Sequence, residues 1–399
     1  MSSAPLYLAA AGCGGRLRQV VQHLLKVLDR PVIIRVYDPN PASIAAARAE
    51  WKAEIVPCAS WEEALSHPGV EWALVGSWNV SHREHVEEAF AAGKNVFAEK
   101  PLATNLEDCL AMHAAWQRSG KLFFFGLVLR YAPLYRQIFA RSRADSIGKI
   151  VSFEFNETLR FNHGGFIHGN WRRYRNNAGT HILEKCCHDI DIAQWLIGSL
   201  PVKVASFGGL NFFTPENREV AEKIGRDPQG RLAYQTWNDP ERQDPFDGKQ
   251  EIVDNQVVIL EYANGVRATF HTNCNAGLHE RRFYLVGAAG AVRADASTGL
   301  IEREVLSFTP KIEKELIDIT DGHDGGHAGG DGVMARHLAA SILHGEEPVA
   351  GMKEALEAAV TCFGIDQALD EGRVVDLLPL WHAAGIEITT GRPEVALAH

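Results

Sequence analysis

The 399-residue sequence lacks the features that define several specialised classes of protein. No apolar run approaches the ~20 residues needed to cross a bilayer, so a membrane-spanning protein is not expected. No basic stripe stands out among 40 Lys and Arg against 50 Asp and Glu, and the formal net charge of −10 argues against nucleic-acid binding. No Cys-x-x-Cys pair occurs among the seven cysteines, whose odd number favours a reducing compartment.

The amino terminus, "MSSAPLYLAAAGCGG", has no basic residue before Arg16. Because a secretory signal peptide begins with a positively charged region, this apolar stretch is better explained as a buried first strand, and we expect a cytoplasmic protein. The composition, 46% hydrophobic and 23% charged, is that of an ordinary soluble protein. A chain of this length exceeds one ordinary core, so the sequence predicts two domains, at 1–130 and 131–399.

The first domain begins with a glycine-rich turn between an apolar run and a helical pattern, "LYLAAAGCGGRLRQVVQHLL". In this strand–turn–helix context, Gly12 and Gly14 let the backbone turn tightly and approach a pyrophosphate at the helix N-terminus. The third position of the Gly-x-Gly-x-x-Gly fingerprint is Leu17, although Gly15 relieves part of the crowding. A plain β–α turn remains the alternative.

A second apolar run, "PVIIRVYD", ends at Asp38. A carboxylate at this point suits the two ribose hydroxyls of NAD and repels the 2′-phosphate of NADP. The alternative is a turn in which Asp38 caps the next helix. Two further strands, "EWALVGS" and "NVFAEKP", enclose a helix, "SHREHVEEAFAAG". This alternation predicts an α/β domain built on a doubly wound parallel sheet, the Rossmann arrangement.

Five segments carry a resemblance to a known family: Gly12-x-Gly14, "SWNVSH" at 77–82, "AGKNVFAEKP" at 92–101, "GLVLRYAPLY" at 126–135 and His188-x-x-Asp191. In this order they resemble the glucose–fructose oxidoreductase/inositol dehydrogenase family (Gfo/Idh/MocA). The resemblance implies a Rossmann domain that binds a nicotinamide cofactor, followed by an α/β domain whose open sheet often mediates oligomerisation. We therefore expect NAD as the cofactor and a homo-oligomer, either a dimer or a tetramer.

The resemblance also implies which residues contact the cofactor. In the loop at 77–82 the family's usual Thr-Pro-Asn is Ser-Trp-Asn, so the place of Trp78 is open. Lys100 follows an apolar strand at the carboxyl edge, where open α/β sheets bind ligands, and a lysine there can hold a substrate hydroxyl. The alternative is a surface lysine that neutralises Glu99. The predicted cofactor contacts are Gly12, Gly14, Gly15, Arg16, Asp38, Ser77, Trp78, Asn79, His82, Glu99, Lys100, Arg130, Trp171 and Arg172.

The second domain is rich in predicted strands, which include "GKIVSFEF", "PVKVASFGG", "DNQVVILEYANGVRATFHTN" and "ERRFYLVGAAGAVRAD". Asn264-Gly265 between alternating runs indicates a hairpin, and the strands predict one large, mostly antiparallel sheet. We expect helices at 183–198 and from about Gly332 to cover it. Residues 211–250 interrupt the sheet, and a loop of this length is usually functional or disordered. We expect an ordered insertion near the substrate or an oligomer contact, anchored by Phe212, Phe213, Tyr234, Trp237 and Phe246.

The stretch "LEKCCHDIDI" places Glu184, His188 and Asp191 on one face of a helix. A metal site lacks a defined further ligand and a redox pair of adjacent Cys186 and Cys187 would be strained, so we expect neither. An imidazole can take the proton of an alcohol as hydride leaves its carbon. The resemblance implies this role for His188, with Glu184 as a catalytic neighbour. The alternative is a histidine satisfied in the core.

Several basic residues surround this helix in the sequence. Guanidinium groups suggest an anionic substrate, although Trp171 and Arg172 meet the cofactor in relatives and the other arginines can face solvent. The stretch "DGHDGGHAGGD" at 321–331 includes His323 and is read as a loop that delivers His327 to the pocket and starts a helix near Asp331, rather than as a metal or phosphate site. The predicted substrate contacts are Arg172, Arg173, Arg175, Lys185, Asp191 and His327.

These features predict an NAD-dependent oxidoreductase that acts on a hydroxyl of a sugar, glycoside or polyol. Lys100 and His188 would handle the reacting hydroxyl, and the arginines point to an anionic carbohydrate. One alternative is an NAD-dependent glycoside hydrolase, which oxidises a ring carbon, eliminates the aglycone, adds water and takes the hydride back. A second alternative is a non-catalytic NAD(H)-sensing regulator, which would need neither Lys100 nor His188.

Overall fold

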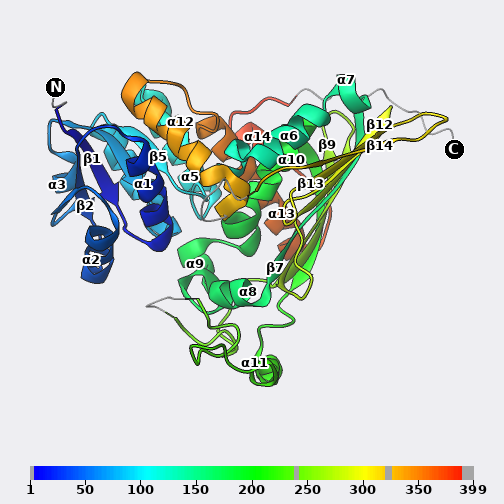
Figure 1. Ribbon diagram of the computed structural model, residues 1–399, viewed down its shortest axis with the longest axis horizontal. Helices are drawn as coiled ribbons and strands as arrows, with labels where there is room; N and C mark the ends of the chain where they lie inside the picture. Colours follow the sequence, from blue (N-terminus) through cyan, green and yellow to red (C-terminus); the bar gives the residue numbers. More distant parts are fainter. Residues whose placement is uncertain (1–3, 238–241, 320–325, 389–399) are drawn as a thin grey trace. The chain divides into compact units, whose positions relative to one another are not determined.

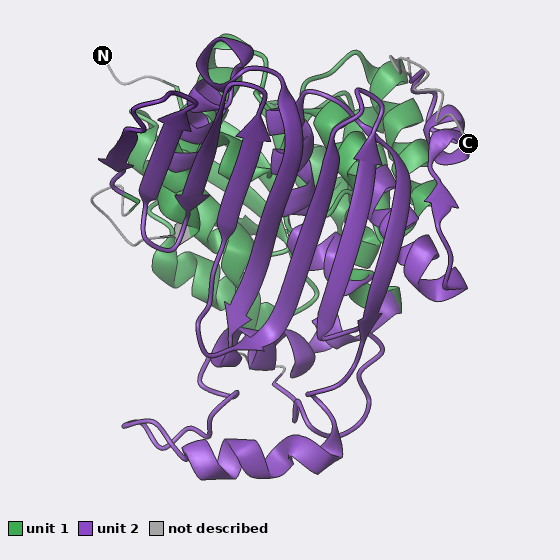
Figure 2. Cartoon of the chain, turned by 90° about the vertical axis from the view of Figure 1, so that its right-hand side faces the viewer, with its two compact units in different colours: residues 1–133, 176–179, 319–359 green, residues 134–175, 180–318, 360–399 purple. Residues whose placement is uncertain are grey.

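The computed structural model describes residues 4–237, 242–319 and 326–388. The chain folds into two compact units (Figures 1 and 2): unit 1 contains residues 1–133, 176–179 and 319–359, and unit 2 contains residues 134–175, 180–318 and 360–399. The first boundary lies close to the expected one after residue 130. The expectation of two contiguous domains did not include the segments 176–179 and 319–359 of unit 1, which are separate from its main part in the sequence.

Unit 1 is built on a six-stranded parallel sheet in the order β3-β2-β1-β4-β5-β6. This order reverses direction next to β1, where doubly wound sheets bind their ligands. Most positions of β1, β4, β5 and β6 are buried, as expected for strands covered on both faces. The predicted Rossmann sheet is confirmed. Its strands are β1 (Leu6–Ala11), β2 (Val32–Tyr37), β3 (Glu54–Pro57), β4 (Val70–Val75), β5 (Asn95–Ala98) and β6 (Phe123–Phe125).

Helices connect successive strands of this sheet. In α1, the buried residues Leu17, Val20, Val21 and Leu24 recur at helical spacing, so one face of the helix packs inward. The other helices of this part are α2 (Pro41–Glu50), α3 (Trp61–Leu65), η1 (Asn79–Ser81), α4 (His82–Ala91), α5 (Leu106–Ser119) and η2 (Val128–Tyr131), with α1 at Gly15–Val27.

The helix expected from about Gly332 is α12 (Gly330–His344), preceded by η6 (Gly326–Gly329). We expected this helix to cover the antiparallel sheet, but it belongs to unit 1 and packs against α1 and η2. Its apolar positions Met334, Leu338 and Ile342 are buried. The expectation was wrong because helical periodicity shows that a helix has a buried face but does not identify what that face contacts.

Unit 2 contains a nine-stranded sheet in the order β14-β13-β12-β11-β7-β10-β9-β8-β15. The β7/β10 pair is parallel and the other neighbouring pairs are antiparallel, as the sequence predicted. The β9–β10 hairpin turns at Asn264-Gly265, where Gly265 has φ +87°. The strands are β7 (Ile150–Arg160), β8 (Pro201–Gly209), β9 (Asn255–Tyr262), β10 (Arg267–Ala276), β11 (Arg282–Gly287), β12 (Gly290–Asp295), β13 (Leu300–Val305), β14 (Ile312–Leu316) and β15 (Val375–Asp376).

In the view of Figure 2 helices lie behind this sheet, and α11 lies below it. The predicted helix at 183–198 is present, but its first turn is a π-helix (Ile182–Cys186) that continues into α10 (Cys187–Ile197). Such π-turns are rare and are found frequently at functional sites. The remaining helices of unit 2 are α6 (Pro133–Arg141), α7 (Ala144–Ile147), α8 (Phe161–His168), η3 (Trp171–Arg173), η5 (Pro215–Asn217), α11 (Arg218–Ile224) and α14 (Leu378–Ala383). Most of α9 (Arg175–Ala178) belongs to unit 1, and α13 (Met352–Glu371) begins in unit 1 and ends in unit 2.

The other face of the sheet exposes apolar side chains. Phe207 is 71% exposed, Val257 48%, Ile259 52% and Tyr284 44%, whereas their neighbours along the same strands, apart from Gly208, are buried. This face is the one toward the viewer in Figure 2. Among the described residues, no helix is long and apolar enough to cross a membrane.

The insertion at 211–250, described at 211–237 and 242–250, packs with Leu159, Ile167 and Cys274 of β7, α8 and β10 into a small core. Four of the five expected anchors form or line this core: Phe213, Tyr234 and Phe246 are buried, and Phe212 packs against them. Trp237 differs, because it is 43% exposed. The start of the insertion is fixed by the buried carboxylate of Asp254, which accepts hydrogen bonds from the backbone N–H groups of residues 211, 212 and 213.

Candidate active site

The glycine-rich turn of unit 1 is a tight cradle of backbone. Gly12 has φ +80° and donates its N–H to the Tyr37 carbonyl at 2.9 Å. A Cβ atom added to Gly12 would lie 2.6 Å from both N and Cα of Ser77, which is closer than non-bonded atoms can approach. A dinucleotide pyrophosphate needs such a bare backbone turn before a helix N-terminus, so these residues fit the cofactor that the fold implies.

The missing third glycine of the fingerprint is compensated from another strand. Leu17 occupies that position and is fully buried. Its side chain lies against Gly76, just after β4, where an added Cβ would be 2.6 Å from the Leu17 Cβ. The close approach that the third glycine usually provides is therefore supplied by Gly76. Gly76 lies in "EWALVGS", and nothing in this segment predicts its contact with Leu17.

Asp38 links the end of β2 to the glycine-rich turn. One carboxylate oxygen accepts the Cys13 N–H at 2.6 Å, and the other accepts the Asn40 N–H at 2.8 Å. The cap of α2 is Asn40, whose side chain accepts from Ala42 N at 3.0 Å, so the alternative that Asp38 caps this helix is wrong. Burial and the charge of Asp38 raise the pKa of the Cys13 thiol to about 12, which keeps it neutral.

The loop after β4 is held by two histidines. Ser77 Oγ lies 2.8 Å from His85 Nδ1. The fully buried His82 ring faces backbone carbonyls on both sides, with Nδ1 2.8 Å from Pro101 O and Nε2 3.2 Å from Ser77 O. Burial lowers the pKa of His82, so its neutral ring ties this loop to the segment that follows Lys100. His82 therefore has a structural role in this loop, and its contact with the cofactor stays a prediction.

Two other residues of this loop lie apart from the histidines. Asn79 is buried and donates from Nδ2 to Ala178 O at 2.9 Å. Trp78, whose place the sequence left open, is 40% exposed. Arg130, in η2, is buried.

Lys100 lies two residues after the end of β5, on the same edge of the sheet as the glycine-rich turn. Its neighbour Glu99 is buried and pairs with Arg16, whose Nε lies 2.9 Å from Glu99 Oε1. Arg16 also contacts Asp331 at 2.7 Å, and Asp331 accepts from His327 Nδ1 at 3.0 Å. Burial alone would raise the pKa of Asp331, but the His327 hydrogen bond and the Arg16 charge hold it well below its usual range.

Arg16 and His327 are therefore brought together in unit 1 through Asp331, which the sequence had singled out only as a helix start. Arg16 and Asp331 lie 315 positions apart, so no local pattern could connect them. His323, from the same glycine-rich stretch, lies outside the described residues. The contacts of Arg16 and His327 with cofactor and substrate remain predictions.

In unit 2, Glu184 and Arg172 form a pair beside the predicted acid–base histidine. Arg172 Nε lies 3.1 Å from Glu184 Oε1, and both side chains are largely buried. The Arg172 guanidinium also stacks on the Trp171 ring at 4.3 Å. His188 and Asp191 lie on α10 and are 3% and 1% exposed. Cofactor contact by Trp171 and Arg172 remains a prediction.

Lys185 belongs to a buried charge network that the sequence analysis missed. Its Nζ lies 3.3 Å from Glu157, and Glu157 also pairs with Arg281 at 2.8 Å. Arg281 makes two further bonds of 2.8 Å to Asp189, which is fully buried. Burial raises the pKa of Asp189 to about 6, although Arg281 opposes the shift. Glu157 could have been found, because period-two alternation places it on the buried face of β7 with Phe155.

Two arginines expected to bind substrate have other partners. Arg173 is 1% exposed and holds the insertion, with bonds of 2.8 and 3.1 Å to the Asp247 carboxylate. We therefore revise its expected role from substrate contact to support of the insertion, because its charge is neutralised away from solvent. Arg175 is about half exposed and pairs with Asp370 at 3.0 Å, as the solvent-facing alternative anticipated.

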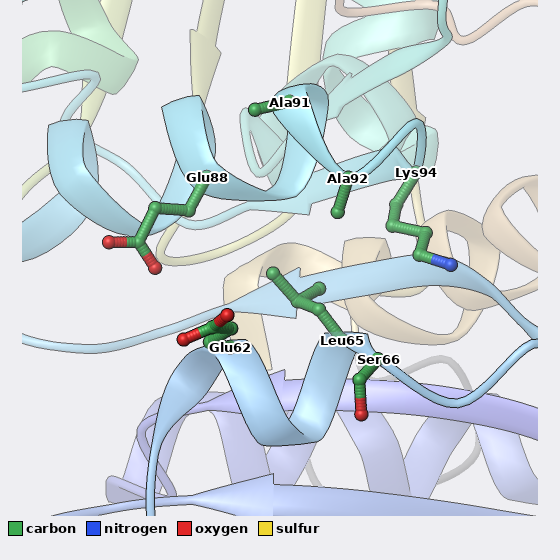
Figure 3. A pocket seen from close by; sticks show the side chains of 7 residues that line it. All are labelled: Glu62, Leu65, Ser66, Glu88, Ala91, Ala92 and Lys94. Carbon is green, nitrogen blue, oxygen red and sulfur yellow. The ribbon is translucent and has the colours of Figure 1, made fainter.

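The described residues contain no group of three His, Cys, Asp or Glu side chains arranged to hold a metal ion. Cys186 and Cys187 are buried thiols that form no disulfide. A pocket of about 500 Å³ lies between α3 and α4 (Figure 3). Lys94, which lines it, donates to Val70 O at the first residue of β4. This pocket is therefore at the amino edge of the sheet, opposite the glycine-rich turn, and is not the predicted site.

Two family models match consecutive parts of the chain. Residues 8–127 match the oxidoreductase family's NAD-binding Rossmann fold, and residues 143–377 match the C-terminal alpha/beta domain of the same family. The chain therefore belongs to the Gfo/Idh/MocA oxidoreductase family, and the predicted enzyme class and NAD cofactor agree with this membership.

Individual relatives are more distant. The chain is 29% identical over 196 residues to an inositol 2-dehydrogenase of Gluconacetobacter diazotrophicus, which covers 48% of this chain and 54% of that protein. It is 28% identical over 182 residues to the 2,7-anhydro-N-acetylneuraminate hydratase of Escherichia coli, at 45% and 47% coverage. Both matches span about half of the relative's length. The structure of levoglucosan dehydrogenase with NADH and levoglucosan shares the fold, with a TM-score of 0.73, 17% identity and coverage of 94% of this chain and all of the other.

Proposed function

We propose that this protein is an NAD-dependent dehydrogenase that oxidises one hydroxyl of an uncharged sugar or polyol. The observation that carries the proposal is the position of Lys100 two residues after the end of β5, on the sheet edge that also presents the bare backbone at Gly12. An ammonium group beside a dinucleotide cradle can hold the reacting hydroxyl and favour loss of its proton. The names of an inositol dehydrogenase and a levoglucosan dehydrogenase among its relatives support a carbohydrate substrate.

Each proposed role follows from the chemistry of the side chain. NAD, when bound, accepts the hydride. His188 takes the hydroxyl proton, Lys100 orients the hydroxyl oxygen, and Asp191 orients the His188 ring from the next turn of α10. Glu184 binds a neighbouring hydroxyl through its carboxylate. The Asp38 carboxylate, half-buried at the end of β2, accepts from the ribose hydroxyls and disfavours a 2′-phosphate.

The substrate is proposed to be uncharged because the cations predicted to receive an anion already have carboxylate partners. The pairs are Arg172 with Glu184, Arg173 with Asp247, Arg175 with Asp370 and Lys185 with Glu157. An anionic sugar would have to displace one of these carboxylates and leave it without its partner. Three of the four pairs are largely buried on both sides, where loss of a partner is expensive; Arg175 with Asp370 is the exposed one.

A glycoside hydrolase that uses NAD transiently is the second candidate. The similarity to a hydratase of an anhydro-sugar favours it, since that name implies addition of water to a sugar. The amount of NADH formed per sugar consumed distinguishes the two candidates. The dehydrogenase forms one NADH for each sugar consumed, whereas the hydrolase releases many aglycones per NAD without net NADH.

The test is incubation of the full-length protein with NAD and a panel of levoglucosan, inositol, glucose, glucuronate and aryl glucosides. We expect NADH absorbance to rise with a neutral sugar or polyol and the oxidised product to equal NADH. Aglycone release with catalytic NAD would overturn the dehydrogenase, and preferred oxidation of glucuronate would overturn the uncharged substrate.

The open face of the nine-stranded sheet, with Phe207, Val257, Ile259 and Tyr284 exposed, supports the proposal of a homo-oligomer. Sedimentation of the wild type and of Ile259→Lys would test it. A wild-type monomer would contradict it. The expected cytoplasmic location stays a prediction.

A further inference from the structure

Trp237 differs from every other aromatic residue of the insertion. Phe213, Tyr234 and Phe246 are buried together in the core that the insertion shares with β7, α8 and β10, with at most 2% of each exposed. Trp237 lies outside this core and is 43% exposed. The insertion is thus stabilised by one group of aromatic side chains and presents the Trp237 indole outward.

The exposed indole is nevertheless held in place by α8. Its ring stacks on His163, with centroids 4.6 Å apart and planes 29° apart, and lies 4.9 Å from the Phe166 ring. The backbone of the insertion reaches α8 closely, because a Cβ on Gly165 would lie 2.1 Å from the Tyr234 carbonyl oxygen. The indole is therefore pre-positioned by its neighbours.

The contacts continue from Phe166 to two further side chains. The resulting row of side chains consists of Trp237, His163, Phe166, Arg172 and Glu184. The Arg172 guanidinium lies 4.9 Å from the Phe166 ring on one side and bonds to Glu184 at 3.1 Å. Glu184 precedes the proposed acid–base residue His188 by one helical turn. All of these residues belong to unit 2, so the row links the insertion to the proposed catalytic helix within one compact unit.

A sugar ring has an apolar C–H face and an edge of hydroxyl groups. An indole face suits the first, while a guanidinium–carboxylate pair can donate to and accept from the second. Because Glu184 neutralises Arg172, the row matches an uncharged ring better than an anion. We propose that this row is a carbohydrate subsite and that Trp237 is a specificity-determining residue supplied by the insertion. This proposal rests on the proposed function.

The experiment compares Trp237→Ala and Trp237→Phe with the wild type, each saturated with NAD. The control is Phe308→Ala, which removes an exposed aromatic side chain of unit 2 that lies outside the row. KM and kcat are measured with levoglucosan and inositol, and binding of both is measured by saturation-transfer NMR. Loss of one aromatic contact should raise KM about 5- to 10-fold in the Ala variant, with kcat kept and a smaller rise in the Phe variant.

Unchanged KM and unchanged NMR binding in Trp237→Ala would overturn the subsite and leave the proposed function standing. A fall in kcat that Trp237→Phe does not rescue would also overturn it, because it would indicate a structural role. Binding by the wild type without hydride transfer, lost in Trp237→Ala, would support the subsite while overturning the dehydrogenase. Failure of the wild type to bind either sugar would overturn the subsite.

Discussion

The glycine-rich turn of unit 1 and the surroundings of α10 in unit 2 are held by different physical means. In unit 1 the cofactor cradle is made of backbone: Gly12 approaches Ser77, and Gly76 makes room for Leu17. In unit 2 the region around α10 is made of paired charges, such as Arg281 with Asp189 and Arg173 with Asp247. At Gly12 and Gly76 the backbone therefore has no room for an added atom, whereas each buried charge of unit 2 depends on its partner.

The largest effect is expected on the chemical step, which also tests whether the two units divide their tasks. His188→Ala or Lys100→Met should slow hydride transfer by roughly 10²–10⁴-fold, because general acid–base assistance is commonly worth this factor. NAD affinity should survive in His188→Ala, since the cradle is in unit 1. Single-turnover formation of NADH measures the rate, and equilibrium titration measures the affinity.

Partial rescue of His188→Ala by added imidazole would support proton transfer. A single-turnover rate equal to that of the wild type would mean that His188 is a histidine satisfied in the core, the alternative left open by the sequence.

The next largest effect concerns the buried charges of unit 2. Arg281→Leu leaves Glu157 without its closest cation and Asp189 without both of its short bonds. Breaking a buried pair in this way costs about 3–5 kcal/mol of unfolding free energy. Denaturant unfolding measures the loss.

Arg293→Leu is the matched control on the same sheet, because Arg293 pairs with Glu302 but is 60% exposed. An exposed pair contributes about 0.2–1 kcal/mol. An equal loss of unfolding free energy in the two variants would show that burial does not set the strength of these ion pairs. It would contradict the role of the buried charges in unit 2.

The same contrast explains how much the sequence could predict. The Rossmann strands, the turn at Gly12 and the Asn264-Gly265 hairpin follow from patterns only a few residues long, and the structure contains them. The partners of Arg16, Arg173 and Arg281 lie 315, 74 and 92 positions away. No local period encodes such pairs. The sequence therefore predicted Arg173 as a contact for an anionic substrate, although Asp247 neutralises its charge in the structure.

A steric test addresses the other half of the comparison. Gly12→Ala places a Cβ 2.6 Å from the Ser77 backbone and imposes an alanine at φ +80°. We expect NAD affinity to fall at least tenfold, which corresponds to about 1.4 kcal/mol. The midpoint of thermal unfolding should fall as well.

Gly93→Ala is the control, because Gly93 has φ +72° but nothing within 4 Å of an added Cβ. It should show only the cost of the left-handed backbone, about 1–2 kcal/mol of stability, with NAD affinity kept. If Gly12→Ala behaves like Gly93→Ala, close approach to Ser77 does not shape the cradle.

The smallest effect is expected at Asp38, because its charged side chain holds the backbone of the glycine-rich turn. The wild type should bind NAD at least tenfold better than NADP, or about 1.4 kcal/mol, because the carboxylate would face the 2′-phosphate. Asp38→Asn removes the charge but keeps one oxygen acceptor for the N–H of Cys13 or Asn40. It should therefore narrow the preference chiefly by improving NADP binding. Asp38→Ala removes both acceptors, so the turn itself should loosen and both affinities should fall. Titration of the two dinucleotides against the three proteins separates charge from positioning. Equal affinity of the wild type for NAD and NADP would show that Asp38 serves the turn alone.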